Sequence, residues 1–310
     1  IDGHPLSIDV AEKSAVCSDC GLKCELTDKN FVGDRGNLDV KSVQEHLISS
    51  WEKNKNREVF KESSRFEEFR KSIRNLITSD AAGSRQRIYE LLNSLVGGLR
   101  VEKSPLKVMI VGSHELGCGV SVIRSEFDKS QIQVVGFDLI ESEFTDLTAD
   151  AHAIPFLDDI FDVVICQAVL EHVINPEMVV SEIFRVLAPG GFVYSEVPFL
   201  QQVHASCFDF SRFTLMGHLL LFKNFHIVRY GRNKGHLYVL AWWVKYAFGQ
   251  EKFPRLFGNI CAIPFFIFAK FIDPIFPQNP FFSASGTYVL AAKDTPQSVK
   301  ERLTWISNKD

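Results

Sequence analysis

The middle of the chain alternates between short apolar runs and longer stretches that are polar or amphipathic. The apolar runs are VMIVG at 108–112, IQVVGFDL at 132–139, FDVVICQAV at 161–169 and GFVYSEVPF at 191–199. Strands that are this continuously apolar are buried on both faces, as in a parallel sheet covered by helices. The pattern therefore predicts an α/β fold with an open, doubly wound sheet over residues 108–199.

The flanking regions predict further elements. Helical spacing of apolar residues predicts one or two amphipathic helices over 41–77 and another helix over about 85–96. The helix over about 85–96 is closed by Gly97-Gly98, and Gly83-Ser84 breaks the helical pattern before it. Two more strands are expected at 225–231 and 285–293. We assign 1–100 to an N-terminal extension and 101–310 to the main domain.

An apolar insert, 235–283, separates the last two predicted strands. Its uncharged run from Leu256 to Ala269 is interrupted by Pro264 and is shorter than the ~20 residues of a membrane-spanning helix. The insert is consistent with a lid over an apolar substrate pocket, with a membrane interface, or with a dimer surface. We favour the lid and the membrane interface, taken together, over the dimer surface.

Composition excludes some partners. The 310-residue chain has a formal net charge of −4, which argues against a nucleic-acid partner. No basic stretch followed by an apolar run opens the sequence, so no signal peptide is expected. Several cysteines lie in apparent core segments, as is usual in a reducing compartment. We expect a cytoplasmic protein, with peripheral membrane contact through 235–283.

A cysteine cluster, CSDCGLKC, holds Cys17, Cys20 and Cys24. C-x-x-C followed by glycine resembles half of a zinc ribbon, in which a tight turn aims two thiolates at one metal. No second C-x-x-C follows. The cluster predicts either a Zn²⁺ site or a loop with free thiols.

A glycine-rich turn follows the first strand and contains Gly112, Ser113, Gly117 and Gly119. Glycines at such a turn let a ligand lie against the backbone, and the next helix directs its free N–H groups at that ligand. The third glycine of a dinucleotide fingerprint is absent, and so is the Gly-Lys-Ser/Thr triplet of a phosphate-binding loop. In doubly wound sheets the ligand lies beyond the carboxyl ends of the strands.

Specific motifs follow in order along the chain. Residues 150–155 read DAHAIP, 161–164 FDVV, 170–172 LEH and 185–191 RVLAPGG. With the spacing between them, these segments resemble the class I S-adenosylmethionine-dependent methyltransferases over about 106–230. The resemblance implies a Rossmann-like seven-stranded sheet, S-adenosylmethionine as cofactor, and methyl transfer to a small-molecule or lipid/glycan-linked acceptor.

The resemblance also implies cofactor-binding roles. Asp138, with Leu139, matches the acid that binds the ribose. Asp150, with Ala151, matches the residue that meets the adenine. Gln167 and Ala168 match the wall beside the methionine portion, and the glycine turn with Ser113 matches the loop beneath it.

Two departures from the family pattern leave a rival class open. Ile110 stands where the family usually has an acid, and Ser113 to Leu116 lengthen the glycine turn. A methyltransferase-like scaffold or binding module without catalysis is the alternative.

The segment 201–222 is expected to contact the substrate. Its DFSRFT run resembles one found in a subset of the family, which includes members associated with glycan and lipid-linked pathways. Arg212 either pairs with Asp209 to hold the loop or binds a carboxylate or phosphate of the substrate. His204 is the candidate general base, because histidine titrates near neutrality.

Overall fold

The computed structural model describes residues 6–9, 14–17, 23–25, 80–98, 105–113, 120–128, 130–140, 142, 144–203, 209–248, 255–273, 275 and 284–293. The N-terminal part contains a three-stranded antiparallel sheet in the order β1-β2-β3. Its strands are β1 Leu6–Asp9, β2 Ser14–Cys17 and β3 Lys23–Glu25. The helices predicted over 41–77 lie outside the described residues.

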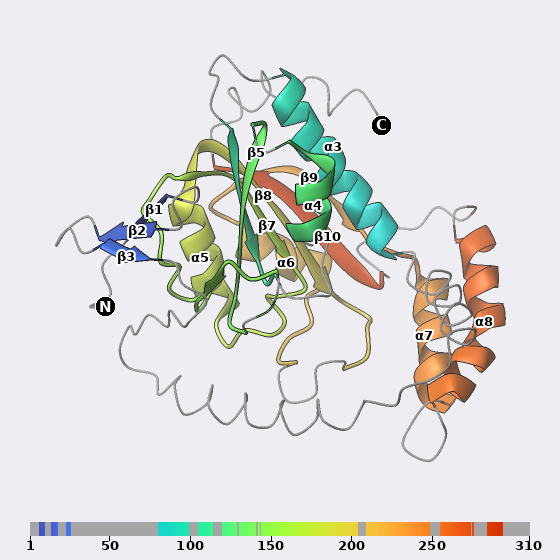
Figure 1. Ribbon diagram of the computed structural model, residues 1–310. Helices are drawn as coiled ribbons and strands as arrows, with labels where there is room; N and C mark the ends of the chain where they lie inside the picture. The colour runs from blue at the N-terminus through green and yellow to red at the C-terminus, as the bar shows by residue number, and fades with distance from the viewer. Residues whose placement is uncertain are drawn as a thin grey trace, which may run out of the picture.

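The main sheet has seven strands in the order β6-β5-β4-β7-β8-β10-β9 (Figure 1). The first five in this order pair in parallel, and β10 is antiparallel to both β8 and β9. The predicted seven-stranded Rossmann-like sheet is thus confirmed. Its strands are β4 Leu106–Val111, β5 Ile132–Asp138, β6 Leu147–Thr148, β7 Phe161–Gln167, β8 Leu187–Pro198, β9 His226–Arg232 and β10 Gly286–Ala292.

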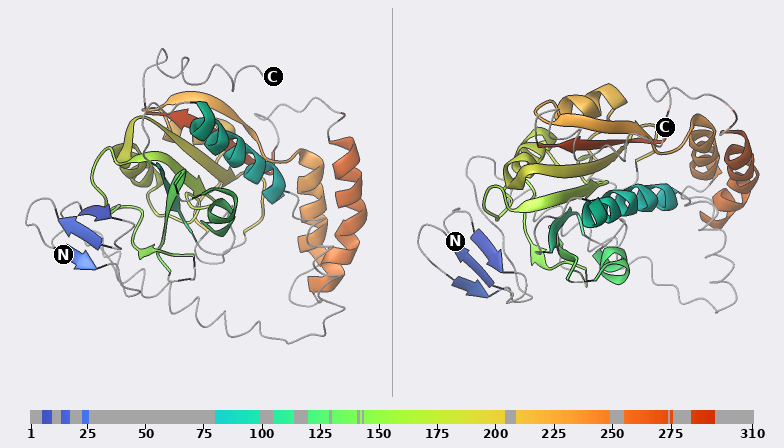
Figure 2. Two further views of the ribbon diagram at one scale, coloured as in Figure 1. Left: turned by 45° about the horizontal axis from the view of Figure 1, so that its top comes forward. Right: turned by 90° about the horizontal axis from the view of Figure 1, so that it is seen from above.

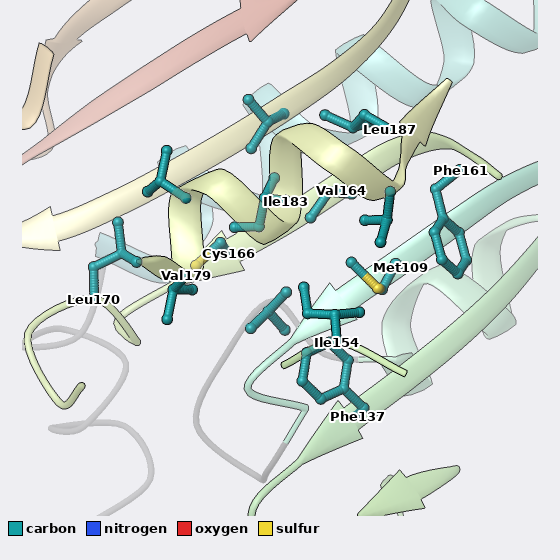
Figure 3. Packing of buried hydrophobic residues seen from close by; sticks show 14 of the residues in the cluster. Met109, Phe137, Ile154, Phe161, Val164, Cys166, Leu170, Val179, Ile183 and Leu187 are labelled. Carbon is teal, nitrogen blue, oxygen red and sulfur yellow. The ribbon is translucent and has the colours of Figure 1, made fainter. Parts of the chain in front are cut away.

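Helices cover both faces of this sheet. Successive residues of β4 point to opposite faces, so Met109 packs in one core and Ile110 in the other. The first core includes α5 (Pro176–Val186) and residues that flank α6 (Leu215–Leu221). Figure 3 shows this core, with Met109, Phe137 and Val164 from the strands facing Val179 and Ile183 of α5.

The second core lies under α3 (Asp80–Gly98) and α4 (Val120–Glu126). Ile88, Leu91, Leu92 and Leu95 supply the apolar face of α3. This helix falls within the range assigned to the N-terminal extension, but its side chains share a core with the main sheet. Figure 2 shows α3 lying along the sheet.

The expected helix break at Gly83-Ser84 is wrong, because α3 begins at Asp80 and runs through both residues. The physical reason is tertiary: Ser84 is buried, and its hydroxyl donates to Glu196 Oε2 at 2.8 Å. A contact with β8 thus stabilises a helical turn that local propensity disfavours.

The apolar insert forms a helical hairpin of α7 (His236–Phe248) and α8 (Arg255–Ile272), with Pro264 inside α8. Figures 1 and 2 show the two helices side by side and apart from the sheet. No helix in the described ranges combines the length and the apolar character that crossing a bilayer requires.

Candidate functional site

The carboxyl ends of β4, β5 and β7 meet at one edge of the sheet, since these strands are parallel neighbours. Gly112, just after β4, has a φ of 75°. A Cβ at this position would lie 2.3 Å from Val169 Cγ2, so a side chain there is sterically excluded. The N–H groups of Gly112 and Ser113 both donate to the carbonyl of Phe137, at 3.0 and 3.2 Å. The turn is therefore fixed against β5 and against the loop after β7.

Ser113 is buried in a cluster of hydroxyl groups. Its Oγ donates to Thr145 Oγ1 at 3.3 Å, and Thr145 Oγ1 lies 2.8 Å from Ser142 Oγ. Thr145 also donates to the carbonyl of Ile140 at 3.1 Å. These contacts join the glycine turn to the loop after β5. Sequence reasoning did not identify Ser142 and Thr145, because they belong to a polar loop without a motif.

Asp138 is the last residue of β5 and pairs in register with Thr148 of β6. Its Oδ1 accepts the N–H of Ile140 at 3.1 Å, which tightens the chain just beyond the strand. The side chains of Asp138 and Leu139 are half-buried. The structure thus places both on the edge where a ligand is expected.

Asp150 lies just after β6, with Ala151 half-buried beside it. Asp150 Oδ1 accepts the backbone N–H of His152 at 2.9 Å and lies 2.7 Å from His152 Nδ1. His152 Nε2 accepts the N–H of Asn175 at 3.2 Å. These partners are consistent with a donor at Nδ1 and an acceptor at Nε2. His152 therefore orients the Asp150 carboxylate, a role that no pattern in the sequence indicated.

Gln167 is the last residue of β7, Ala168 follows it, and both are held to β8. Gln167 Nε2 donates to Glu196 Oε2 at 3.0 Å, and the N–H of Ala168 donates to the carbonyl of Glu196 at 3.0 Å. Ala168 has a φ of 52°, a left-handed conformation that is uncommon for a residue with a Cβ. Such a strained residue persists only when its surroundings fix it, and these two bonds do so.

Glu196, near the end of β8, is the centre of a buried polar network that sequence reasoning missed. Its carboxylate accepts from Ser84, Gln167, Tyr194 and Arg87, the last at 2.8 Å. Arg87 Nε also donates to Tyr194 OH at 2.7 Å. Burial, together with the Glu196 charge, raises the pKa of Tyr194 well above its usual value. The network connects α3 to the strand ends that carry the predicted site.

Glu171 follows β7 in the LEH motif and is fully buried. Burial raises the pKa of its carboxyl to about 8, although the Arg212 charge acts in the opposite direction. His172 Nε2 lies 3.6 Å from Glu171 Oε1. The Glu171 backbone carbonyl accepts the N–H groups of Phe210 and Ser211, at 2.9 and 3.2 Å. This contact joins the loop after β7 to the DFSRFT segment.

Arg212 donates hydrogen bonds to several groups among the described residues. Nε donates to the carbonyl of Gln201 at 2.9 Å, Nη1 to that of Ser211 at 2.8 Å and Nη2 to that of Gln202 at 3.0 Å. Both Nη atoms also donate to the buried Asp209 carboxylate. A guanidinium has five N–H donors, so these bonds favour the loop-holding role. A contact of Asp209 or Arg212 with substrate stays a prediction.

The structure does not describe some of the predicted site residues. Gly117, Gly119, His204 and Cys20 lie outside the described residues, as do the side chains of Cys17 and Cys24. Within the described ranges, no group of three or more His, Cys, Asp or Glu side chains is placed to hold a metal ion. Zinc therefore stays a prediction.

Part of the chain matches known proteins in sequence. Residues 114–195 match the family described as Methyltransferase domain. The ubiquinone biosynthesis O-methyltransferase of Pseudomonas fluorescens SBW25 is 29% identical over 117 residues, covering 32% of this chain and 50% of that protein. The enzyme of the same name from Aeromonas salmonicida A449 is 28% identical over 96 residues, covering 26% and 40%. The chain thus spans about half the length of the curated relatives it matches.

Several of the solved structures that resemble this chain carry methyltransferase names, and another is named as the [4+2]-cyclase SpnF. Phosphoethanolamine N-methyltransferase 2 of Haemonchus contortus, in complex with S-adenosyl-L-methionine, has a TM-score of 0.41 at 15% identity, covering 67% of this chain and 53% of that chain. The CurJ carbon methyltransferase has a TM-score of 0.43 at 11% identity, covering 68% and 54%. Residues 114–195 thus resemble a methyltransferase domain, in agreement with the S-adenosylmethionine-dependent methyltransferase motifs in the same part of the chain.

Proposed function

We propose that the chain binds S-adenosylmethionine at the carboxyl edge of the sheet and transfers its methyl group to a small-molecule or lipid/glycan-linked acceptor. The observation that carries the proposal is the placement of Gly112, Asp138 and Asp150 after adjacent strands of one edge. The P. fluorescens and A. salmonicida relatives are named as O-methyltransferases, which supports oxygen as the accepting atom.

The groups at this edge fit the proposed cofactor. A carboxylate at the end of the second strand accepts hydrogen bonds from a ribose diol, and Asp138 is in that position. Asp150, oriented by His152, offers an acceptor for an amino group such as that of adenine. Gly112 keeps the turn under the site free of a side chain. The donor and acceptor set therefore suits a nucleoside with an exocyclic amine.

When bound, S-adenosylmethionine supplies a methyl group that its sulfonium has already activated. The protein's task is then mainly alignment of the acceptor, an effect worth ~7–11 kcal/mol in well-oriented systems. The hydrogen bonds that fix Gln167, Ala168 and Asp150 keep their part of the edge rigid. A hydroxyl acceptor must also lose a proton, and His204 is the proposed base for that step.

The test is thermal melting with S-adenosylhomocysteine, since a ligand that binds only the folded state raises its stability. We expect the melting temperature to rise by about 5 °C or more at a hundredfold excess over Kd. The variant Asp138→Asn should lose most of this shift, because the ribose contact loses its carboxylate.

Asp128→Asn is the matched control. Asp128 Oδ1 also accepts an N–H two residues ahead, from Ser130 at 2.7 Å, but it lies before β5 at the opposite edge. This variant should keep the shift. Retention of the shift in Asp138→Asn would show that the site is misplaced, and no shift in the parent protein would favour the non-catalytic scaffold.

The acceptor requires a separate experiment. Untargeted metabolite comparison between a deletion strain and its parent should show compounds that differ by one methyl group. Methyl transfer to the identified compound by purified protein, and its loss in Asp138→Asn, would establish the reaction.

A further inference from the structure

The α7–α8 hairpin has a small core of its own. Tyr238 and Ala241 of α7 pack against Ala262, Phe266 and Ala269 of α8, and this cluster is separate from both cores of the sheet. The N–H of Leu237 donates to Asp273 Oδ1 at 3.4 Å, which joins the start of α7 to the end of α8. The inner faces of the two helices thus bury their apolar side chains against each other.

The outer faces of the hairpin expose large apolar side chains. Trp243 is 62% exposed, Phe268 53% and Phe271 66%. About half of the exposed large apolar side chains among the described residues lie between 240 and 275. Scattered apolar residues are normal on a protein surface, but this concentration on one hairpin indicates an interaction surface.

The charges of the hairpin indicate which partner suits this surface. Between 235 and 283 the sequence has four lysine or arginine side chains and two acidic side chains, Glu251 and Asp273, so the insert is net basic in a chain whose net charge is −4. Lys270 is exposed on α8, and Lys245 Nζ lies 5.6 Å from the centre of the Tyr246 ring on α7. Lysines beside exposed aromatic rings are typical of helices that lie on anionic bilayers. A second copy of the same face would instead bring like charges together.

The position of the hairpin connects it with the proposed site. β9 is parallel to β8, because both are antiparallel to β10. Gly286, where β10 begins, pairs with Pro198, where β8 ends. The insert therefore leaves the sheet at the same edge that carries Asp138 and Gln167. Figure 1 shows the hairpin beside this sheet, beyond β10.

We propose that the α7–α8 hairpin docks the protein in the plane of an anionic phospholipid bilayer, with its exposed aromatic side chains in the headgroup region. The helices lie on the surface rather than span it, in agreement with the hydropathy of the described helices. Docking brings the carboxyl edge of the sheet close to the bilayer. The proposal does not depend on methyl transfer, and binding to lipid can be measured without cofactor or acceptor.

The test is co-sedimentation of the full chain with vesicles of phosphatidylcholine alone and of an equal mixture of phosphatidylcholine and phosphatidylglycerol. We expect binding to the mixed vesicles that weakens as salt rises, since salt screens the lysines. Trp243→Ser combined with Phe268→Ser should weaken binding by about tenfold or more, because apolar side chains that enter the bilayer are lost. Lys245→Glu combined with Lys270→Glu should weaken it by at least about fivefold per site.

Matched controls come from exposed residues elsewhere. Met216 and Leu220 of α6 are 61% and 64% exposed, so Met216→Ser combined with Leu220→Ser removes comparable apolar surface away from the hairpin. Lys107 and Lys223 are exposed and serve as the charge control with Lys107→Glu and Lys223→Glu. Both control variants should bind vesicles like the parent protein. Circular dichroism of every variant verifies that it is folded.

Three results would overturn the proposal. One is no binding of the folded parent protein to mixed vesicles. Another is equal binding by the parent protein and both hairpin variants. The third is a dimer in solution that the hairpin variants dissociate while vesicle binding is absent, which would assign the surface to a second copy of the chain.

Discussion

At the residue scale, two buried side chains are held in their neutral forms. Burial raises the pKa of Glu171 to about 8 and lowers the pKa of His218 to about 3. His218 lies between Ser195 Oγ and Thr287 Oγ1, at 3.0 Å from each, and so bridges β8 and β10. Both groups make stability depend on pH, but over different ranges.

The direction of each pH dependence follows from whether the folded or the unfolded state binds more protons. Between about pH 4.5 and 8, folded Glu171 keeps a proton that the unfolded chain releases, so this group lowers the unfolding free energy as pH rises. Between about pH 3 and 6.5, unfolded His218 binds a proton that the folded chain excludes, so this group lowers the unfolding free energy as pH falls. Above about pH 6.5 only the Glu171 contribution still changes.

We expect Glu171→Gln to stabilise the protein at alkaline pH. The variant has no buried carboxyl to ionise, so its unfolding free energy should exceed that of the parent protein by a few kcal/mol at about pH 8.5 and by less at about pH 6. Urea denaturation at both values measures the difference. The exposed Glu177 gives the control Glu177→Gln. Parallel pH dependence of Glu171→Gln and the parent protein would contradict the assignment.

At the scale of elements, the connection of α3 to β8 is polar as well as apolar. Arg87 donates to Tyr194 and Glu196 of β8 and to Asn233 Oδ1, at 3.0 Å, just after β9. Its guanidinium also lies 4.3 Å above the Tyr288 ring. Removal of one member of such a network leaves buried groups without partners, which costs more than the bond itself.

A double-mutant cycle on Arg87 and Glu196 tests this connection. Arg87→Met and Glu196→Gln should each lower the unfolding free energy by about 2–3 kcal/mol, a range reduced for the partial exposure of Arg87. The double variant should cost less than the sum by about 1 kcal/mol or more. The control is Glu90→Gln, which removes the charge from the acceptor of an exposed hydrogen bond with Gln86 and should change stability by less than about 0.5 kcal/mol. Additive effects of Arg87→Met and Glu196→Gln would show that the pair is not coupled.

At the scale of the whole molecule, the hairpin is an addition to a complete sheet. The N–H of Asn233 donates to the carbonyl of Gly286 at 2.8 Å, and that of Ser285 to the carbonyl of Lys234 at 2.9 Å. The pairing of β9 with β10 therefore continues to the base of the insert. Lys234 and Ser285 are close enough for a two-residue turn to join them.

Replacement of 235–284 by Asn-Gly should leave a folded domain. Asn-Gly favours the turn that matches the twist of paired strands, and the deleted core is separate from the cores of the sheet. We expect cooperative urea unfolding within about 2 kcal/mol of the parent protein, and the melting shift with S-adenosylhomocysteine should persist. Loss of cooperative unfolding would show that the hairpin contributes to the main core.

The local sequence pattern was sufficient to predict those elements whose burial is evident from their own residues. The strands at 108–112, 132–139 and 161–169 were predictable because a strand buried on both faces is apolar throughout. The placement of Asp138 at the carboxyl edge followed from the same pattern. β6, by contrast, has only two residues and leaves no periodicity from which it can be recognised.

The sequence by itself determined the parallel core, the edge that carries Gly112 and Asp138, and the position of the apolar insert, since each depends on a run of neighbouring residues. The expected role of Asp150 came from the resemblance to the methyltransferases. Only the tertiary structure decided the helix through Gly83-Ser84, the contacts around Glu196 and the burial that displaces the Glu171 pKa. These features depend on groups such as Arg87 and Glu196, which are 109 residues apart and meet only when α3 packs against the sheet.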